Sequence, residues 1–267
     1  MKKIYLMTIL IFLSFLGACF SRDHVLRIGV AFHPASDILE LIRDDLANEG
    51  ITLDIRVFTH FSLANPALAF NEIDANFIQH IHFMNEFNQA TNNDLYFAQG
   101  IYHAKLSLYS NVFSSIDEIS YNSEIIMIND HINFARSLIL LDQANLITLD
   151  DNTNVLANEN NIIANPLNLS FRKVDQVTMA QVYHEQGRRL AIMYPTFARM
   201  IDPTNNLIDE IIFAEELTDF TKSYAIGIAI NHQNKNNPNI LTLLELLNSS
   251  KVSDWIIQNY AWAAIPY

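Results

Sequence analysis

Short runs of β-branched and other apolar residues alternate along this chain with stretches in which apolar residues recur at helical spacing. In the first part of the chain the pattern predicts strands over 25–32, 52–58 and 74–78, helices over 35–49, 61–71 and 81–90, and a long strand-rich stretch over 95–110. A strand–helix–strand order is typical of parallel strands with helices packed on the faces of the sheet.

The second part repeats this alternation. Strands are predicted over 124–129, 147–149, 169–174, 190–194, 207–216 and 224–231, and helices over 132–145, 177–186, 239–248 and 252–260. We therefore expect an α/β protein with two lobes, each a mixed sheet flanked by helices, and a ligand cleft between them. The expected first lobe is 25–111 plus 224–267, and the expected second lobe is 112–223.

The amino-terminal segment has the pattern of an export signal. Lys2 and Lys3 precede an almost wholly apolar run over 4–16, and small residues follow that run. A bilayer-spanning helix needs about 20 apolar residues, so this run is too short for a comfortable span. No other stretch approaches that length, and the remainder is expected to be a soluble domain outside the cytoplasm.

Cys19 is the only cysteine of the chain, which excludes a disulfide framework and a cysteine-based metal site. The stretch Leu-Gly-Ala-Cys ending at this residue resembles a bacterial lipobox. It implies a signal peptide over 1–18, lipid-modified Cys19, and a tether over 19–24, so that acyl chains such as palmitate hold the domain at a membrane of the cell envelope. An ordinary signal with an incidental cysteine, or an uncleaved anchor helix, is the alternative.

Composition narrows the function classes. The chain has 16 Lys and Arg against 29 Asp and Glu, a net charge of −13, which disfavours nucleic acid as a partner. Six glycines leave little for a phosphate-binding loop, and the motifs of serine hydrolases and zinc proteases are absent from the sequence. We therefore expect neither an enzyme nor a bound cofactor.

Histidines and one arginine are the candidate ligand-binding groups. His80 and His82 have the spacing that places both side chains on one side of a strand, and His60 and His103 lie near predicted strand ends. Imidazoles in such an arrangement bind a transition metal or line a cleft as hydrogen-bonding groups. Arg136 lies where a strand meets a helix, so it either grips a ligand carboxylate with help from the helix N-terminus or is an ordinary surface arginine.

Several segments, in order, resemble the methionine-binding lipoprotein family of bacterial ABC importers, also called the NlpA lipoprotein family. The resemblance runs from Arg27 to the C-terminus, and its most specific stretch is Asn71 to His80, which is similar to the family's G-x-I-D-A-N-x-F-Q-H. Further similar segments are His103 to Ser110, Asn129 to Leu138, Asn165 to Leu169 and Ala263 to Tyr267.

This resemblance implies a periplasmic-binding-protein-like fold with an amino acid held between two lobes, and delivery of L-methionine or a related molecule to an ABC permease and ATPase. It also implies that Arg136 pairs with the ligand carboxylate. The other ligand-binding residues implied by position are Phe61, His80, Phe83, His103, Tyr109, Asn133, Tyr194 and Thr196.

The chain departs from the family where an asparagine would bind the polar backbone of the ligand, because Ile226 occupies that position. This change leaves other ligands open, namely a dipeptide, D-methionine, or a methionine derivative without a free amine. Two further functions also remain: a surface or structural lipoprotein that no longer binds methionine, and a metal-binding lipoprotein that uses His60, His80, His82 and His103.

Overall fold

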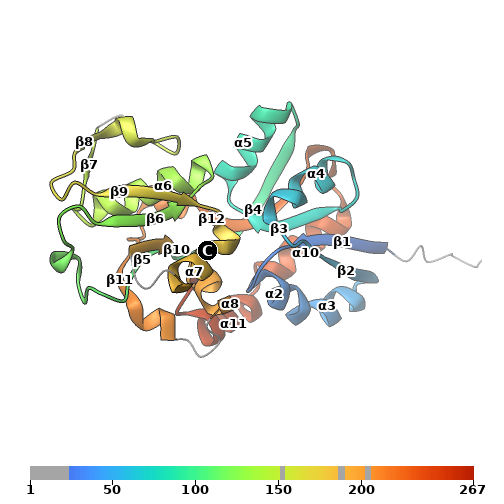
Figure 1. Ribbon diagram of the computed structural model, residues 1–267. Coiled ribbons are helices and arrows are strands. Elements are labelled where there is room, and N and C mark those ends of the chain that lie inside the picture. Colours follow the sequence, from blue (N-terminus) through green and yellow to red (C-terminus); the bar gives the residue numbers. More distant parts are fainter. Residues whose placement is uncertain (1–23, 151–153, 186–189, 202–205) are drawn as a thin grey trace, which may run out of the picture.

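The computed structural model describes residues 24–150, 154–185, 190–201 and 206–267, and it arranges them around two separate sheets (Figure 1). The predicted signal peptide, Cys19 and residues 19–23 of the predicted tether lie outside these ranges. Within them, no helix is both long enough and apolar enough to cross a bilayer.

The first sheet has six strands in the order β13-β4-β12-β3-β1-β2. Its strands are β1 (His24–Val30), β2 (Ile51–Val57), β3 (Ala75–Gln79), β4 (Leu95–Ala104), β12 (Ala225–Asn231) and β13 (Ala264–Pro266). The pairs β1–β2 and β1–β3 are parallel, whereas β12 runs antiparallel to both β3 and β4. The helices of this lobe are α2 (Ala35–Leu41), α3 (Arg43–Asn48), α4 (Ala64–Ala69), α5 (Ile81–Thr91), α10 (Pro238–Leu247) and α11 (Ser250–Tyr260).

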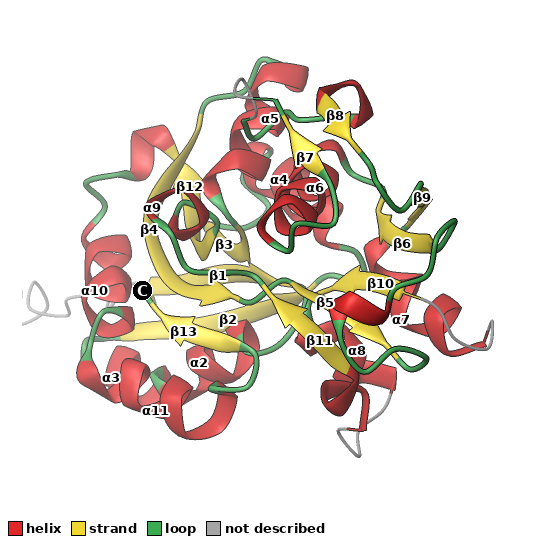
Figure 2. Ribbon diagram, turned by 90° about the vertical axis from the view of Figure 1, so that its left-hand side faces the viewer, coloured by secondary structure: helices red, strands yellow, loops and turns green. Residues whose placement is uncertain are grey.

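The second sheet has five strands in the order β11-β5-β10-β6-β9 and is also mixed. Its strands are β5 (Ser107–Ser110), β6 (Glu124–Ile128), β9 (Ser170–Val174), β10 (Leu190–Met193) and β11 (Ile211–Ala214). Helices α6 (His131–Gln143), α7 (Gln176–Glu185) and α8 (Pro195–Ile201) accompany it, and Figure 2 shows this sheet beside the first. A two-stranded sheet of β7 (Thr148–Leu149) and β8 (Ile162–Ala164) lies at its edge (Figure 1). These two sheets with their helices are the two-lobed α/β fold that the alternation of patterns predicts.

The continuous apolar runs of the sequence form the central strands. Every residue of β3 and β10 is buried, as are all but one residue of β6 and of β12. Strands that are covered on both faces need apolar side chains at successive positions, which is why these segments show no polar alternation.

The chain crosses between the sheets where β4 gives way to β5. The stretch over 95–110 was expected to belong to the first lobe, but β5 pairs with β10 and β11 of the second sheet. The return crossing comes after α9 (Asp219–Lys222), immediately before β12. Because Glu215 N donates to the carbonyl oxygen of Leu106 at 2.9 Å, a hydrogen bond joins the two crossing regions.

Several elements differ from the sequence prediction. The helix predicted over 35–49 is divided at Ile42, and the predicted strand over 207–216 is a 3₁₀ helix (Asn206–Glu210) followed by β11. Helix α8 was not predicted, because its start at Pro195 directly follows a buried strand without an intervening polar loop.

Candidate functional site

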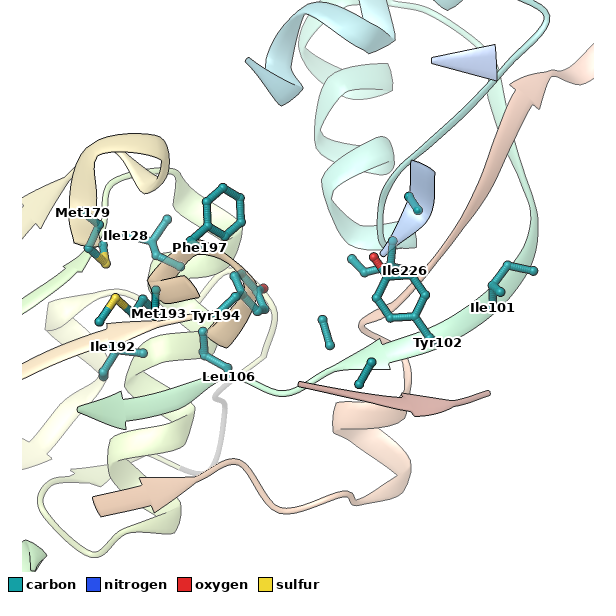
Figure 3. Close-up of a cluster of buried hydrophobic side chains, with 14 of the residues drawn as sticks. Ile101, Tyr102, Leu106, Ile128, Met179, Ile192, Met193, Tyr194, Phe197 and Ile226 are labelled. Atoms are coloured by element: carbon teal, nitrogen blue, oxygen red, sulfur yellow. The ribbon is translucent and has the colours of Figure 1, made fainter. Parts of the chain in front are cut away.

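A pocket lies between the two lobes and takes its walls from both. The first lobe contributes Phe32, Phe61, Ile78, Gln79, His80, Phe83, Tyr102, Ala104 and Ile226, and the second lobe contributes Asn133, Gln176, Tyr194, Thr196 and Phe197. The space between these side chains is about 430 Å³, including the part open to solvent. Figure 3 shows Tyr102 and Ile226 on one side of the interlobe space and Tyr194 and Phe197 on the other.

Six of the nine residues expected to bind a ligand line this pocket: Phe61, His80, Phe83, Asn133, Tyr194 and Thr196. The other three, His103, Tyr109 and Arg136, are buried outside its lining. Phe32, Tyr102, Gln176 and Phe197 also line the pocket, and no pattern in the sequence marks them as ligand-binding. Ile226 is marked in the sequence because it replaces a polar residue of the family pattern.

Arg136 is completely buried, and groups of the protein itself occupy its donors. Its Nε donates to Glu215 Oε1 at 2.8 Å, and its Nη2 donates to Glu215 Oε2 at 2.5 Å. Nη2 also donates to the carbonyl oxygen of Ala104, and Nη1 to the Tyr194 hydroxyl, both at 2.9 Å. The ring of Tyr224 lies 4.6 Å from the guanidinium carbon. The carboxylate expected from a ligand is therefore replaced here by that of Glu215.

Glu215 also fixes the protonation of His103. Burial alone would raise the pKa of Glu215, but the charge and hydrogen bonds of Arg136, together with His103, lower it below its usual range. The ionised carboxylate can only accept, so His103 Nε2 carries the proton and donates to Glu215 Oε2 at 2.8 Å. Burial lowers the pKa of His103 and keeps its ring neutral, so Nδ1 has no hydrogen, and this buried atom has no partner.

A chain of hydrogen bonds connects Arg136 to the pocket. The Tyr194 hydroxyl accepts from Arg136 and donates to Asn133 Oδ1 at 2.7 Å. His80 Nδ1 accepts from the backbone N–H of Phe83 at 3.2 Å, so Nε2 holds the ring proton and faces Asn133 Oδ1 at 3.5 Å. The polar atoms of His80, Asn133 and Tyr194 are thus already engaged.

The N-terminus of α6, which the sequence marks as a candidate anion-binding site, is also occupied by a carboxylate of the protein. Asp130 caps α6 by accepting from the backbone N–H of Asn133 at 2.9 Å, and the Asn133 amide donates to both oxygens of the same carboxylate. Burial raises the pKa of Asp130, an effect that these hydrogen bonds partly offset. The Arg136 guanidinium and the N-terminus of α6 are the two groups that could bind a ligand carboxylate. Each of them therefore binds a carboxylate of the protein.

The histidines that suggested a metal site contact different side chains and do not converge on one point. His60 Nε2 lies 3.1 Å from Asp175, and His82 Nε2 lies 2.7 Å from the Ser223 hydroxyl. No group of three or more His, Cys, Asp and Glu side chains suited to a metal ion occurs among the residues that the structure describes.

Comparison with known proteins identifies one matching family and relatives that are lipoproteins. A family model described as NlpA lipoprotein matches residues 26–267. The chain is 28% identical over 279 residues to the methionine-binding lipoprotein MetQ of Bacillus subtilis, covering 100% of this chain and 99% of that protein.

Two crystal structures share the fold. A lipoprotein from Bacillus subtilis superposes with a TM-score of 0.85 at 27% identity, covering 91% of this chain and 98% of that one. A pheromone cOB1 precursor/lipoprotein of the YaeC family from Enterococcus faecalis gives a TM-score of 0.82 at 30% identity, covering 91% and 100%.

The buried ion pair predicts a large effect of Glu215→Gln on stability. The substitution keeps the shape of the side chain but leaves the Arg136 charge buried without a counter-charge, so we expect a loss of about 3–5 kcal/mol in the free energy of unfolding, measured by urea denaturation. Glu216→Gln, at the adjacent exposed position, is the matched control and should stay within about 0.5 kcal/mol of the parent. A loss below about 1 kcal/mol for Glu215→Gln would contradict the assigned role of the pair.

The neutral histidines predict a loss of stability with acidification. Burial and the Arg136 charge lower the pKa of His80 well below its usual value, and burial also lowers those of His82 and His103. Because an unfolded histidine takes up a proton near about pH 6.5 and the folded ones resist it, stability should be complete above that pH and fall as the pH drops below it.

This pH dependence is measurable as the unfolding midpoint in urea at pH 7, 6 and 5. His80→Asn, which can still cap a helix, should reduce the decline. His184→Asn, at an exposed position of α7, should leave the decline as it is. Equal slopes for the parent and His80→Asn would show that His80 is not one of the groups responsible.

Proposed function

The chain belongs to the NlpA lipoprotein family, and from that membership we propose that it takes methionine or a related small amino-acid-like molecule from the surroundings and delivers it to an ABC permease. As a solute-binding lipoprotein it is not an enzyme. The observation that carries the proposal is the pocket between the lobes, whose walls come from both lobes.

The composition of the pocket suits a ligand with a flexible apolar part. Phe61 and Phe83 meet edge to face with ring centroids 5.4 Å apart, and Phe32 faces Phe197 across the lobes at 5.2 Å. Aromatic rings make favourable contacts with a thioether sulfur, each contributing about 0.3–1.5 kcal/mol. The relative named as a methionine-binding lipoprotein supports the same ligand class.

The two-lobed arrangement supports capture by closure. We assign residues 24–104 and 225–267 to one lobe and 107–222 to the other, according to the sheet in which each strand lies. His60 and Asp175 contact each other across the lobes at 3.1 Å, so the structure corresponds to a state with the lobes in contact. A ligand between the lobes adds further contacts to both walls and favours this state over an open one.

Two observations favour a second function, that of a surface lipoprotein. Ile226 offers the ligand no hydrogen bond, and Arg136 is occupied by Glu215. Both fit a surface lipoprotein that retains the fold and binds an envelope partner instead of methionine. A genome in which the gene has no neighbouring permease and ATPase genes, together with a protein that binds none of the compounds below, would favour this alternative.

Binding is expected in calorimetry with residues 24–267 against L-methionine, D-methionine, methionine derivatives and short peptides, with micromolar or tighter affinity for at least one of them. Phe83→Ala removes an aromatic wall and should weaken that binding about tenfold or more. Phe87→Ala, on the same helix but packed into a different apolar cluster, should change it little. Absence of heat with every compound at millimolar concentration would end the proposal.

The anchor is tested separately. In the full-length chain, Cys19→Ser removes the proposed site of acylation, so the protein should move from the membrane fraction to the soluble fraction or lose its processed form. The parent chain should incorporate a labelled fatty acid, whereas the variant should not. Labelling of the Cys19→Ser protein would show that the lipid is attached elsewhere or that no lipobox operates.

A further inference from the structure

Among the described lining residues, one fully buried side-chain polar atom has no partner. Tyr102 lines the pocket from β4, its side chain is 1% exposed, and its hydroxyl is fully buried without a hydrogen bond. A buried hydroxyl that forms no hydrogen bond costs about 1–3 kcal/mol. A molecule that enters the pocket with a hydrogen-bonding group can satisfy this hydroxyl.

Four other polar side chains of the wall are committed to hydrogen bonds within the protein, whereas Gln176 and Thr196 line the pocket without a fully buried polar atom that lacks a partner. His80, Asn133 and Tyr194 form the connected chain already described. Gln79 is held on both sides of its amide, since its oxygen accepts from Asn65 at 2.8 Å and its nitrogen donates to Asn65 and Asn76. Tyr102 therefore differs from these four in having its polar atom free for a ligand.

No side chain with a fixed charge lines the pocket. Among the lining residues that the structure describes, none is Asp, Glu, Lys or Arg. Arg136 lies behind Tyr194 with Glu215 as its counter-charge, and His80 is a neutral donor. A zwitterion placed here would bury two charges against neutral partners, which is costly unless each charge is paired.

Tyr102 lies beside the position where the sequence departs from the family. Residue 226 on β12 is the register partner of Tyr102 on β4, and paired residues of antiparallel strands project to the same face. Figure 3 shows the Tyr102 hydroxyl on the side of Ile226, in the space between the lobes. The hydroxyl is therefore the polar group at the place where the isoleucine presents only methyl groups.

We propose that the pocket binds a small molecule whose polar end is uncharged, with the Tyr102 hydroxyl as the group that hydrogen-bonds that end. The inference rests on the proposed function and specifies its ligand class: an amino-acid derivative with its amine and carboxyl groups capped, in preference to the free zwitterion. Burial raises the pKa of the Tyr102 phenol, so the hydroxyl stays protonated and donates or accepts as the ligand requires.

The ligand class is tested by calorimetry with four compounds of one side chain: L-methionine, N-acetyl-L-methionine, L-methioninamide and N-acetyl-L-methioninamide. The set removes the ammonium and carboxylate charges one at a time and then together, which separates charge from size. We expect the doubly capped compound to bind at least about tenfold more tightly than L-methionine, a difference of about 1.4 kcal/mol. Tighter binding of L-methionine would overturn the inference while leaving the proposed function intact. Binding of none of the four would overturn the inference, whereas the proposed function fails only if D-methionine and the short peptides also give no heat.

The role of Tyr102 is tested with Tyr102→Phe, which keeps the ring and removes the hydroxyl. Its affinity for the doubly capped compound should fall about fivefold to tenfold, as expected for one neutral hydrogen bond. Because the removed group has no partner in the free protein, the thermal midpoint should stay equal or rise, so impaired folding cannot explain the loss.

Tyr109→Phe is the matched control. Tyr109 is also a buried tyrosine whose hydroxyl has no partner, but it lies on β5 outside the pocket. Its substitution should leave the affinity within about twofold of the parent. Equal affinities of the parent and Tyr102→Phe for the doubly capped compound would overturn the assignment of Tyr102.

Discussion

The buried guanidinium of Arg136 is the constraint around which the rest of the structure is arranged. A charge that is wholly removed from water must be paired and hydrogen-bonded, because its desolvation is otherwise not compensated. Its partners come from the end of β4, the end of β10 and the segment after β11. Ala104 and Glu215 lie in the two stretches where the chain passes between the sheets, whereas Tyr194 follows β10 within the second lobe. Satisfying one side chain therefore fixes the relative position of both crossings.

The same pairing sets the electrostatic character of the pocket. Since Glu215 neutralises Arg136 within the protein, the field that reaches the pocket is that of an ion pair and not of a free cation. Tyr194 and Asn133 then relay an ordered set of hydrogen bonds that ends at a neutral His80. The walls present aromatic faces, amides and hydroxyls and, among the described lining residues, no side chain with a fixed charge.

The sequence predicted most of the fold, because the apolar periodicities that define strands and helices are local. It also singled out Arg136, since a cation at a strand–helix junction is unusual in so acidic a chain. The partner could not be inferred, because Glu215 lies 79 residues away and the contact depends on how the lobes close. Similarly, His103 and Tyr102 are neighbours on one strand, and only the three-dimensional structure shows which of them faces the pocket.

The internal carboxylate changes what a ligand must offer. A free ligand carboxylate that sought Arg136 would have to displace Glu215, which would then be buried with only His103 beside it, or displace the Tyr194 hydroxyl and break the chain to His80. Either exchange leaves a buried polar or charged group without its partner. The free-energy cost of that group usually exceeds the free energy gained from the new contact with the ligand. A ligand without that charge needs no exchange, because it leaves the ion pair intact and adds a partner for the hydroxyl that lacks one. The family fold is thereby compatible with a change of ligand class made without altering the arginine itself.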